Sequence, residues 1–190
     1  MKKSLVILSV AVFATLALAG TPRLQAQSGM AATTATPDKV VDQLLNMVEG
    51  EMVPLAEAMP ADKYNFAPSN GNFKGVRTFA EQVKHVASTN YFMFGAAASM
   101  QPTGMPKMSD LKTKEQTVQA LKDSFAFAHQ AIATLNEQNA LEQVKPVDGV
   151  DTRAGIMLFA IVHMNDHFGQ MVEYLRMNGI VPPSSQPRKK

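Results

Sequence analysis

Two histidines four residues apart, followed by a glutamine, are the residues of this sequence best suited to chemistry. His163, His167 and Gln170 lie in the segment HMNDHFGQMVEYLRMNGIVPP. In a helix His163 and His167 are about 40° apart around the axis, so both rings could reach one metal ion. Ile156 and Phe159 share this side, which should therefore face the protein interior. A buried polar group without a partner costs about 1–3 kcal/mol, and a divalent ion would satisfy both rings.

A third histidine, His85, is the natural partner of this pair. It lies in the segment KHVASTN, about 115° from the centre of the apolar face of another predicted helix and on the same side as Phe92. A side chain on such a shoulder can point into the groove between two neighbouring helices. His85 could thus complete a three-histidine metal site with His163 and His167. The alternative is three separate histidines that each satisfy their polar atoms through hydrogen bonds.

The residues around these histidines exclude some of the reactions that a metal site could carry out. Met164 follows His163, whereas zinc proteases with this histidine spacing need a glutamate at that position. The chain has no cysteine, so thiolate catalysis is excluded and any metal site must use His, Asp or Glu. Asp166 could accept an imidazole N–H, but we interpret it as a solvated charge. No residue is identifiable as a general base.

The remaining histidine and the methionines are interpreted as structural. His129 has Phe125 and Ala133 four residues away on either side, so we expect it to be an exposed or boundary residue. Several of the 13 methionines fall in the apolar stripes of the predicted helices. Core filling is therefore a better interpretation of them than a methionine-lined copper site.

Residues 1–26 have the pattern of a secretory signal peptide. Two lysines precede an apolar run from Leu5 to Ala19, which is shorter than the roughly 20 residues that span a bilayer as a helix. Cleavage after Ala19 or Ala26 would give a periplasmic or secreted protein. The alternative is an uncleaved membrane anchor.

Export makes a prediction about the mature N-terminus. Because the small residues after the apolar run are suitable cleavage sites, mass spectrometry of the mature protein should find residue 20 or 27 at its start. An intact initiator methionine on the mature protein would contradict the prediction.

The charge of the chain argues against nucleic-acid binding. The formal net charge of +2 includes Lys2, Lys3 and Arg23. Without these residues 15 basic and 16 acidic residues remain, a net charge of −1, and three of the basic ones lie in a tail over residues 184–190. Nucleic-acid binding needs a basic footprint, so we expect none, and we expect no membrane contact after signal cleavage.

Four helical patterns follow a small polar lead-in at residues 27–36. Apolar residues recur every three or four positions over residues 37–59, 77–98, 113–135 and 153–178. Thr113 and Gln116 have the spacing of a capping box, Asp151 or Thr152 could cap the last helix, and Gly179 is placed to end it. No segment alternates with period two as a strand does, so we predict an all-α four-helix bundle over residues 37–183.

The two histidine segments resemble the DinB-like superfamily of metal-binding helical bundles, over about residues 37–183. The specific pattern is one histidine in the second helix, then H-x-x-x-H-x-x-Q, a basic residue at Arg176, a glycine stop at Gly179 and closing prolines. The resemblance implies a bundle with up-down-down-up helix order. It also implies a divalent ion, nickel or zinc, held by His85, His163 and His167 with open positions for water or substrate.

The resemblance further implies a choice of functions. Characterised members include enzymes that use low-molecular-weight thiols as nucleophiles, but those thiols are cytosolic and this chain carries an export signal. We therefore expect an exported metal-dependent hydrolase or transferase that acts on a small molecule. The alternatives are an envelope protein that binds metal without catalysis and one that binds a small ligand without metal. With any of these functions, the chain could form a homodimer.

Overall fold

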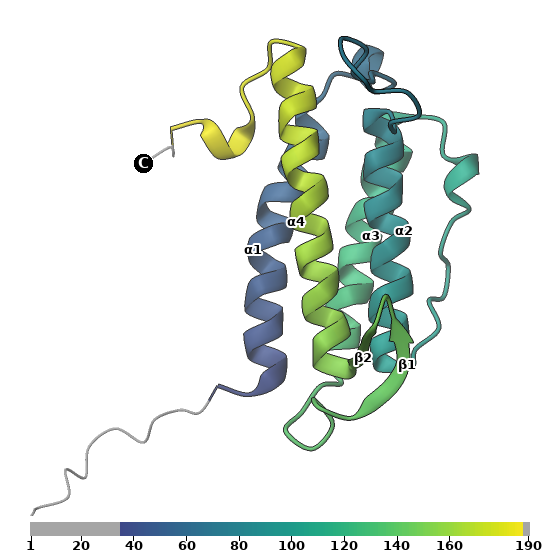
Figure 1. Ribbon diagram of the computed structural model, residues 1–190, viewed down its shortest axis with the longest axis vertical. Coiled ribbons are helices and arrows are strands. Elements are labelled where there is room, and N and C mark those ends of the chain that lie inside the picture. Colours follow the sequence, from purple (N-terminus) through teal and green to yellow (C-terminus); the bar gives the residue numbers. More distant parts are fainter. Residues whose placement is uncertain (1–34, 188–190) are drawn as a thin grey trace, which may run out of the picture. The chain divides into compact units, whose positions relative to one another are not determined.

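The fold is known from a computed structural model that describes residues 35–187. The predicted signal peptide, most of the lead-in and the last three tail residues lie outside this range. Four helices dominate the described chain: α1 (Pro37–Ala58), α2 (Phe79–Ala98), α3 (Lys114–Ile132) and α4 (Arg153–Met177). The prediction of an all-α four-helix bundle is confirmed (Figure 1).

The helices run in the order up, down, down and up (Figure 1). The connection over residues 99–113 returns along the bundle, so that α3 runs parallel to α2. Two contacts agree with α2 and α4 running in opposite directions. Gln82 near the start of α2 contacts Gln170 near the end of α4, and Arg153 at the start of α4 contacts Ala97 near the end of α2. Asn90 of α2 donates to Ser124 of α3, each about halfway along its helix.

Capping residues set where the helices begin. Thr113 and Gln116 form the predicted capping box of α3, and Thr78 with Glu81 forms a second one at the start of α2. The hydroxyl of Thr152 accepts the N–H of the third residue of α4. Each cap satisfies backbone groups that the first turn of a helix leaves unpaired. The four helices begin within two residues of the predicted starts, and α1, which has no side-chain cap, begins with Pro37 in its first turn.

Residues 143–152 correct the expectation that the chain has no strands. β1 (Gln143–Val147) and β2 (Val150–Thr152) pair as an antiparallel hairpin. Asp148 and Gly149 form its turn with φ values of 49° and 85°. Two central residues with positive φ are typical of the tight turns that match the twist of a hairpin. Strands of five and three residues are too short to show period-two alternation, so the Asp-Gly pair was the available signal.

Several methionines fill the core, as predicted. Met52, Met59, Met93 and Met171 are each at most 4% exposed. Burying a side chain of this size stabilises a fold by about 1.5–3 kcal/mol, and the flexible thioether fits irregular gaps between helices. In the loop between α2 and α3, Met105 is 40% exposed.

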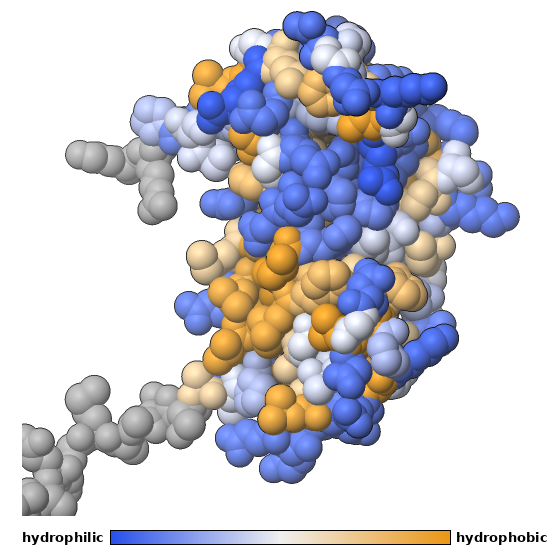
Figure 2. Space-filling view, in the orientation of Figure 1, coloured by the Kyte–Doolittle hydropathy of each residue, from blue (hydrophilic) through white to orange (hydrophobic). Residues whose placement is uncertain are grey.

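An apolar surface covers the first halves of α1 and α4. Val40, Leu44 and Met47 of α1 and Leu158 and Val162 of α4 are each at least 37% exposed. Figure 2 shows this apolar area, and shows that the half of the same face where α4 ends is largely hydrophilic. Exposed apolar patches are typical of surfaces that contact another molecule. Within residues 35–187 no helix is both long and apolar enough to cross a membrane.

His129 is a boundary residue, as predicted, but it has partners that its own helix does not supply. Its Nδ1 lies 2.5 Å from a carboxylate oxygen of Asp42, and its Nε2 lies 2.9 Å from one of Glu49. Both carboxylates belong to α1, which packs beside α3. Burial by itself would lower the pKa of His129, but the hydrogen bonds to Glu49 and Asp42 outweigh burial and raise it.

The raised pKa of His129 predicts a pH-dependent contribution to stability. The ion pairs contribute fully below the unfolded pKa of 6.5 and are lost as the pH rises through the higher folded pKa. Urea unfolding should find His129→Gln less stable than the original chain by about 1 kcal/mol at pH 5.5. The difference should shrink toward pH 9, and a difference that stays constant over this range would contradict the prediction.

Candidate metal centre

Three histidine rings from two helices meet inside the bundle. His163 and His167 lie one turn apart on α4, and His85 reaches them from α2. The ring centroids are 4.5–5.1 Å apart, and Nε2 of His85 lies 3.1 Å from Nε2 of His163. One ligand nitrogen from each ring can be chosen so that all three lie within 4.8 Å of one another. The fold thus brings together the three residues that were predicted as metal ligands.

Two contacts hold α2 and α4 on either side of this cluster. Toward the start of α2, Nε2 of Gln82 donates to Oε1 of Gln170 at 2.8 Å. Toward the end of α2, the guanidinium of Arg153 donates to the backbone carbonyl of Ala97 at 2.8 Å. Because His85 lies between Gln82 and Ala97 along α2, both contacts fix the helix that carries it.

The surroundings of His85, His163 and His167 lower all three pKa values and so favour the neutral form of each ring. Burial, together with the positive charge of Arg77, lowers the pKa of His85 to about 4. Burial also lowers the pKa of His163, although the nearby carboxylate of Asp166 opposes the shift. Burial and the neighbouring His163 ring lower the pKa of His167 to about 4. Neutral imidazoles keep a lone pair on one nitrogen, which is the form that binds a metal ion.

Unpaired buried atoms support a metal ion at this place. Nδ1 of His167 and Oε1 of Gln82 are buried and have no hydrogen-bond partner among residues 35–187. A buried polar atom in this condition costs about 1–3 kcal/mol. A divalent ion is a partner that an imidazole nitrogen can use, and three imidazoles are a donor set that suits nickel and zinc. The residues present therefore fit a divalent ion.

The other polar residues near the rings form a chain of side chains across the two helices. Nε2 of Gln170 donates to a carboxylate oxygen of Asp166 at 2.9 Å, while Oε1 of Gln170 accepts from Gln82. Asp166 is exposed and makes no hydrogen bond to a histidine among the described residues, in agreement with a solvated charge. Gln82 is 1% exposed. It was missed in the sequence, where its only signal is its position three residues before His85.

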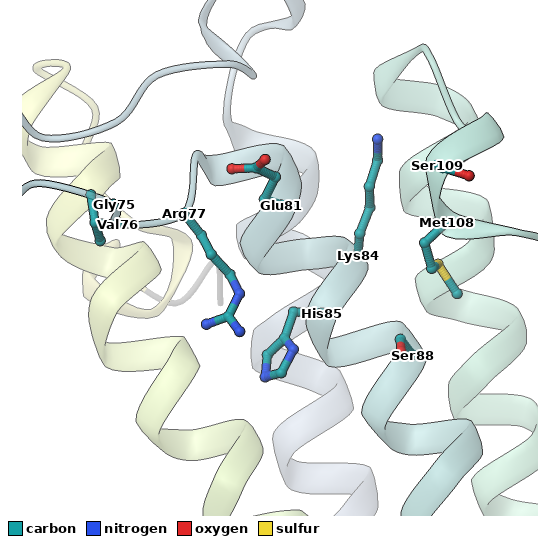
Figure 3. A pocket seen from close by; sticks show the side chains of 9 residues that line it. All are labelled: Gly75, Val76, Arg77, Glu81, Lys84, His85, Ser88, Met108 and Ser109. Carbon is teal, nitrogen blue, oxygen red and sulfur yellow. The ribbon is translucent and has the colours of Figure 1, made fainter.

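A hollow of about 550 Å³ opens beside His85. Arg77, Glu81 and Lys84 are among its lining residues, and the guanidinium of Arg77 extends toward the His85 ring (Figure 3). Arg77 precedes the first residue of α2 by two positions and lies in a loop. The sequence predicted a helix from residue 77, with Arg77 as its first residue, and gave no sign that this side chain lies beside His85.

Comparison with known proteins agrees with this geometry. The sequence model of the DinB superfamily matches residues 44–171, which is more than half of the chain and includes all three histidines. No curated protein matches the chain. The resemblance inferred from the histidine segments is confirmed at the level of the family.

Proposed function

Because this chain belongs to the DinB superfamily and its fold brings three histidines together, we propose that it holds one divalent ion at His85, His163 and His167. We further propose that the ion is nickel or zinc and that the protein acts as an exported metal-dependent hydrolase or transferase. Export rests on the signal pattern of residues 1–26. A small molecule is the proposed substrate, and a homodimer is the proposed oligomer.

The observation that carries the proposal is a cluster of three ligand groups without a fourth. Among residues 35–187, the group of side chains that could hold an ion contains His85, His163 and His167 and no carboxylate. Structural zinc sites usually have four protein ligands, whereas catalytic sites keep an open position. When bound with an open position, a divalent ion acts as a Lewis acid and makes a nucleophile available near neutral pH.

The chain's own residues would prepare the site for this chemistry. The three rings supply neutral donors, so the positive charge of the ion is not cancelled by ligands. The contact between Gln82 and Gln170 holds the two ligand helices at a fixed separation. The hollow gives a small molecule access to His85, which is among its lining residues. Arg77 adds a positive charge at this entrance.

Cobalt substitution tests the open position. The Co²⁺ protein should change its visible spectrum when azide or a small thiol is added, because an exogenous ligand can enter the coordination shell. The His129→Ala variant should respond in the same way, since His129 pairs with α1 away from the cluster. A spectrum indifferent to every small ligand, together with a fourth protein ligand, would assign the site to the structural class.

Metal binding without catalysis is the second candidate. It is favoured by the absence, among the described residues, of a carboxylate that hydrogen-bonds one of the three rings. Asp166 bonds to Gln170, and the carboxylate of Glu81 accepts the backbone N–H of Thr78. Neither is placed as a general base in this arrangement. A cobalt protein that exchanges ligands but turns over no ester, amide or thiol substrate would support this second candidate.

A further inference from the structure

Two hollows adjoin along one side of α2. The first, of about 550 Å³, contains Arg77 and His85, and the second, of about 670 Å³, lies between α2 and the α2–α3 connection. Ser88 lines both of them. His85, Ser88 and Phe92 are spaced by three and four residues, which places them on one side of the helix. From His85 to Phe92 this side is about 10 Å long.

The two adjoining hollows are together called the groove. The end of the groove that contains His85 is positively charged. The side chain of Arg77 is exposed and forms no hydrogen bond or ion pair with the described residues. Lys84 donates to the backbone carbonyl of Leu111 at 2.7 Å, a neutral partner that leaves its charge uncompensated. Glu81 is the one carboxylate among the lining residues, and it is committed to capping α2. Two cations against one carboxylate favour an anionic ligand.

The other end of the groove is apolar. Tyr91, Phe92, Met100, Pro102 and Met105 line the second hollow. Phe92 is 61% exposed and Met105 is 40% exposed, although both are large apolar side chains. Ligand sites combine mostly apolar walls with a few polar groups that fix orientation. Exposed apolar side chains that line a hollow are therefore placed to contact the apolar part of a ligand.

We propose that this groove binds a small amphiphilic anion, with its carboxylate at Arg77 and an apolar chain of about 10 Å along Phe92 and Met105. The proposal names the substrate class of the metal centre, and in that respect it rests on the proposed function. In this orientation the polar end of the ligand lies next to His85, where the chemistry would occur. The apolar end points away from the three rings and would provide binding energy without reacting.

Calorimetric titration with sodium octanoate tests the proposal on the mature chain, both metal-loaded and stripped with a chelator. Acetate has the charge without the chain, and octylamine has the chain with the opposite charge. Each should bind at least about tenfold more weakly than octanoate. Arg77→Gln and Phe92→Ser should each weaken octanoate binding by a similar factor. Arg176→Gln, an exposed arginine of α4 outside both hollows, should leave it unchanged.

The outcomes separate this proposal from the metal assignment. The side chains of Arg77 and Phe92 are both exposed, and the hydrogen bond that Tyr174 donates to Arg77 goes to the backbone carbonyl. Both variants should therefore fold.

The proposal would be overturned if either variant bound octanoate with unchanged affinity, or if octylamine bound as tightly as octanoate. Octanoate should also bind the stripped protein, since Arg77 and Phe92 are not metal ligands. If the protein proved not to bind a metal ion, octanoate binding to the stripped protein would still be expected.

Discussion

Replacing His167 by alanine should abolish metal binding, so that elemental analysis of the purified protein falls from one ion per chain to background. His167 is 5% exposed and its ring centroid lies within 4.6 Å of both other rings. Two histidines rarely hold a divalent ion without a third ligand, and among the described residues no carboxylate is within reach to replace the lost ring. The protein should be produced without an affinity tag and without chelators, because either would alter the metal content.

His129→Ala is the matched control. It also removes an imidazole, but a half-buried one that pairs with Asp42 and Glu49 on α1. It should retain the ion. His167→Leu provides a second loss variant that fills the space of the ring and removes the unpaired Nδ1 atom, so it should fold at least as stably as the stripped protein. Full metal content in His167→Ala and His167→Leu would show that the ion is held elsewhere.

Adding the ion to the stripped protein should raise the midpoint of thermal unfolding by about 8–16 °C. A ligand that binds only the folded state at 1,000 times its dissociation constant stabilises that state by about 4 kcal/mol. For a domain of this size each kcal/mol moves the midpoint by about 2–4 °C. Circular dichroism at 222 nm would follow the unfolding, with and without zinc or nickel.

The histidine variants make this second measurement specific. In His167→Ala the added ion should leave the midpoint unchanged, whereas in His129→Ala the increase should equal that of the original chain. An equal increase in His167→Ala would mean that the ion stabilises the protein through other residues. No increase in the original chain would count against a bound ion and favour a bundle that binds a small ligand without metal.

Helix positions were predictable because they depend on local signals. Apolar residues recur with the helical period, and the caps at Thr113 and Thr152 mark the starts of α3 and α4. The hairpin over residues 143–152 was missed because its strands are short and its start and end are polar. Its signal was a turn, Asp148-Gly149, whose positive φ angles suit few other residue pairs.

The candidate site was predictable in part, for a different reason. His163 and His167 share a helix face, so their proximity follows from spacing alone. His85 needed the packing of α2 against α4, which the family resemblance implied and the fold now provides. Contacts between helices leave no local trace in a sequence. The carboxylates beside His129 and the contact between Gln82 and Gln170 therefore appear only in three dimensions.

The two contacts that flank the histidine cluster also determine how an ion would enter it. Gln82 with Gln170, and Arg153 with Ala97, keep α2 and α4 together without any metal. The conformational entropy of the two helices is therefore lost when the protein folds. Little further entropy is lost when an ion binds. The site is preorganised, in contrast to small zinc domains that fold only around their ion. An ion bound at this site would consequently be able to exchange while the bundle stays folded.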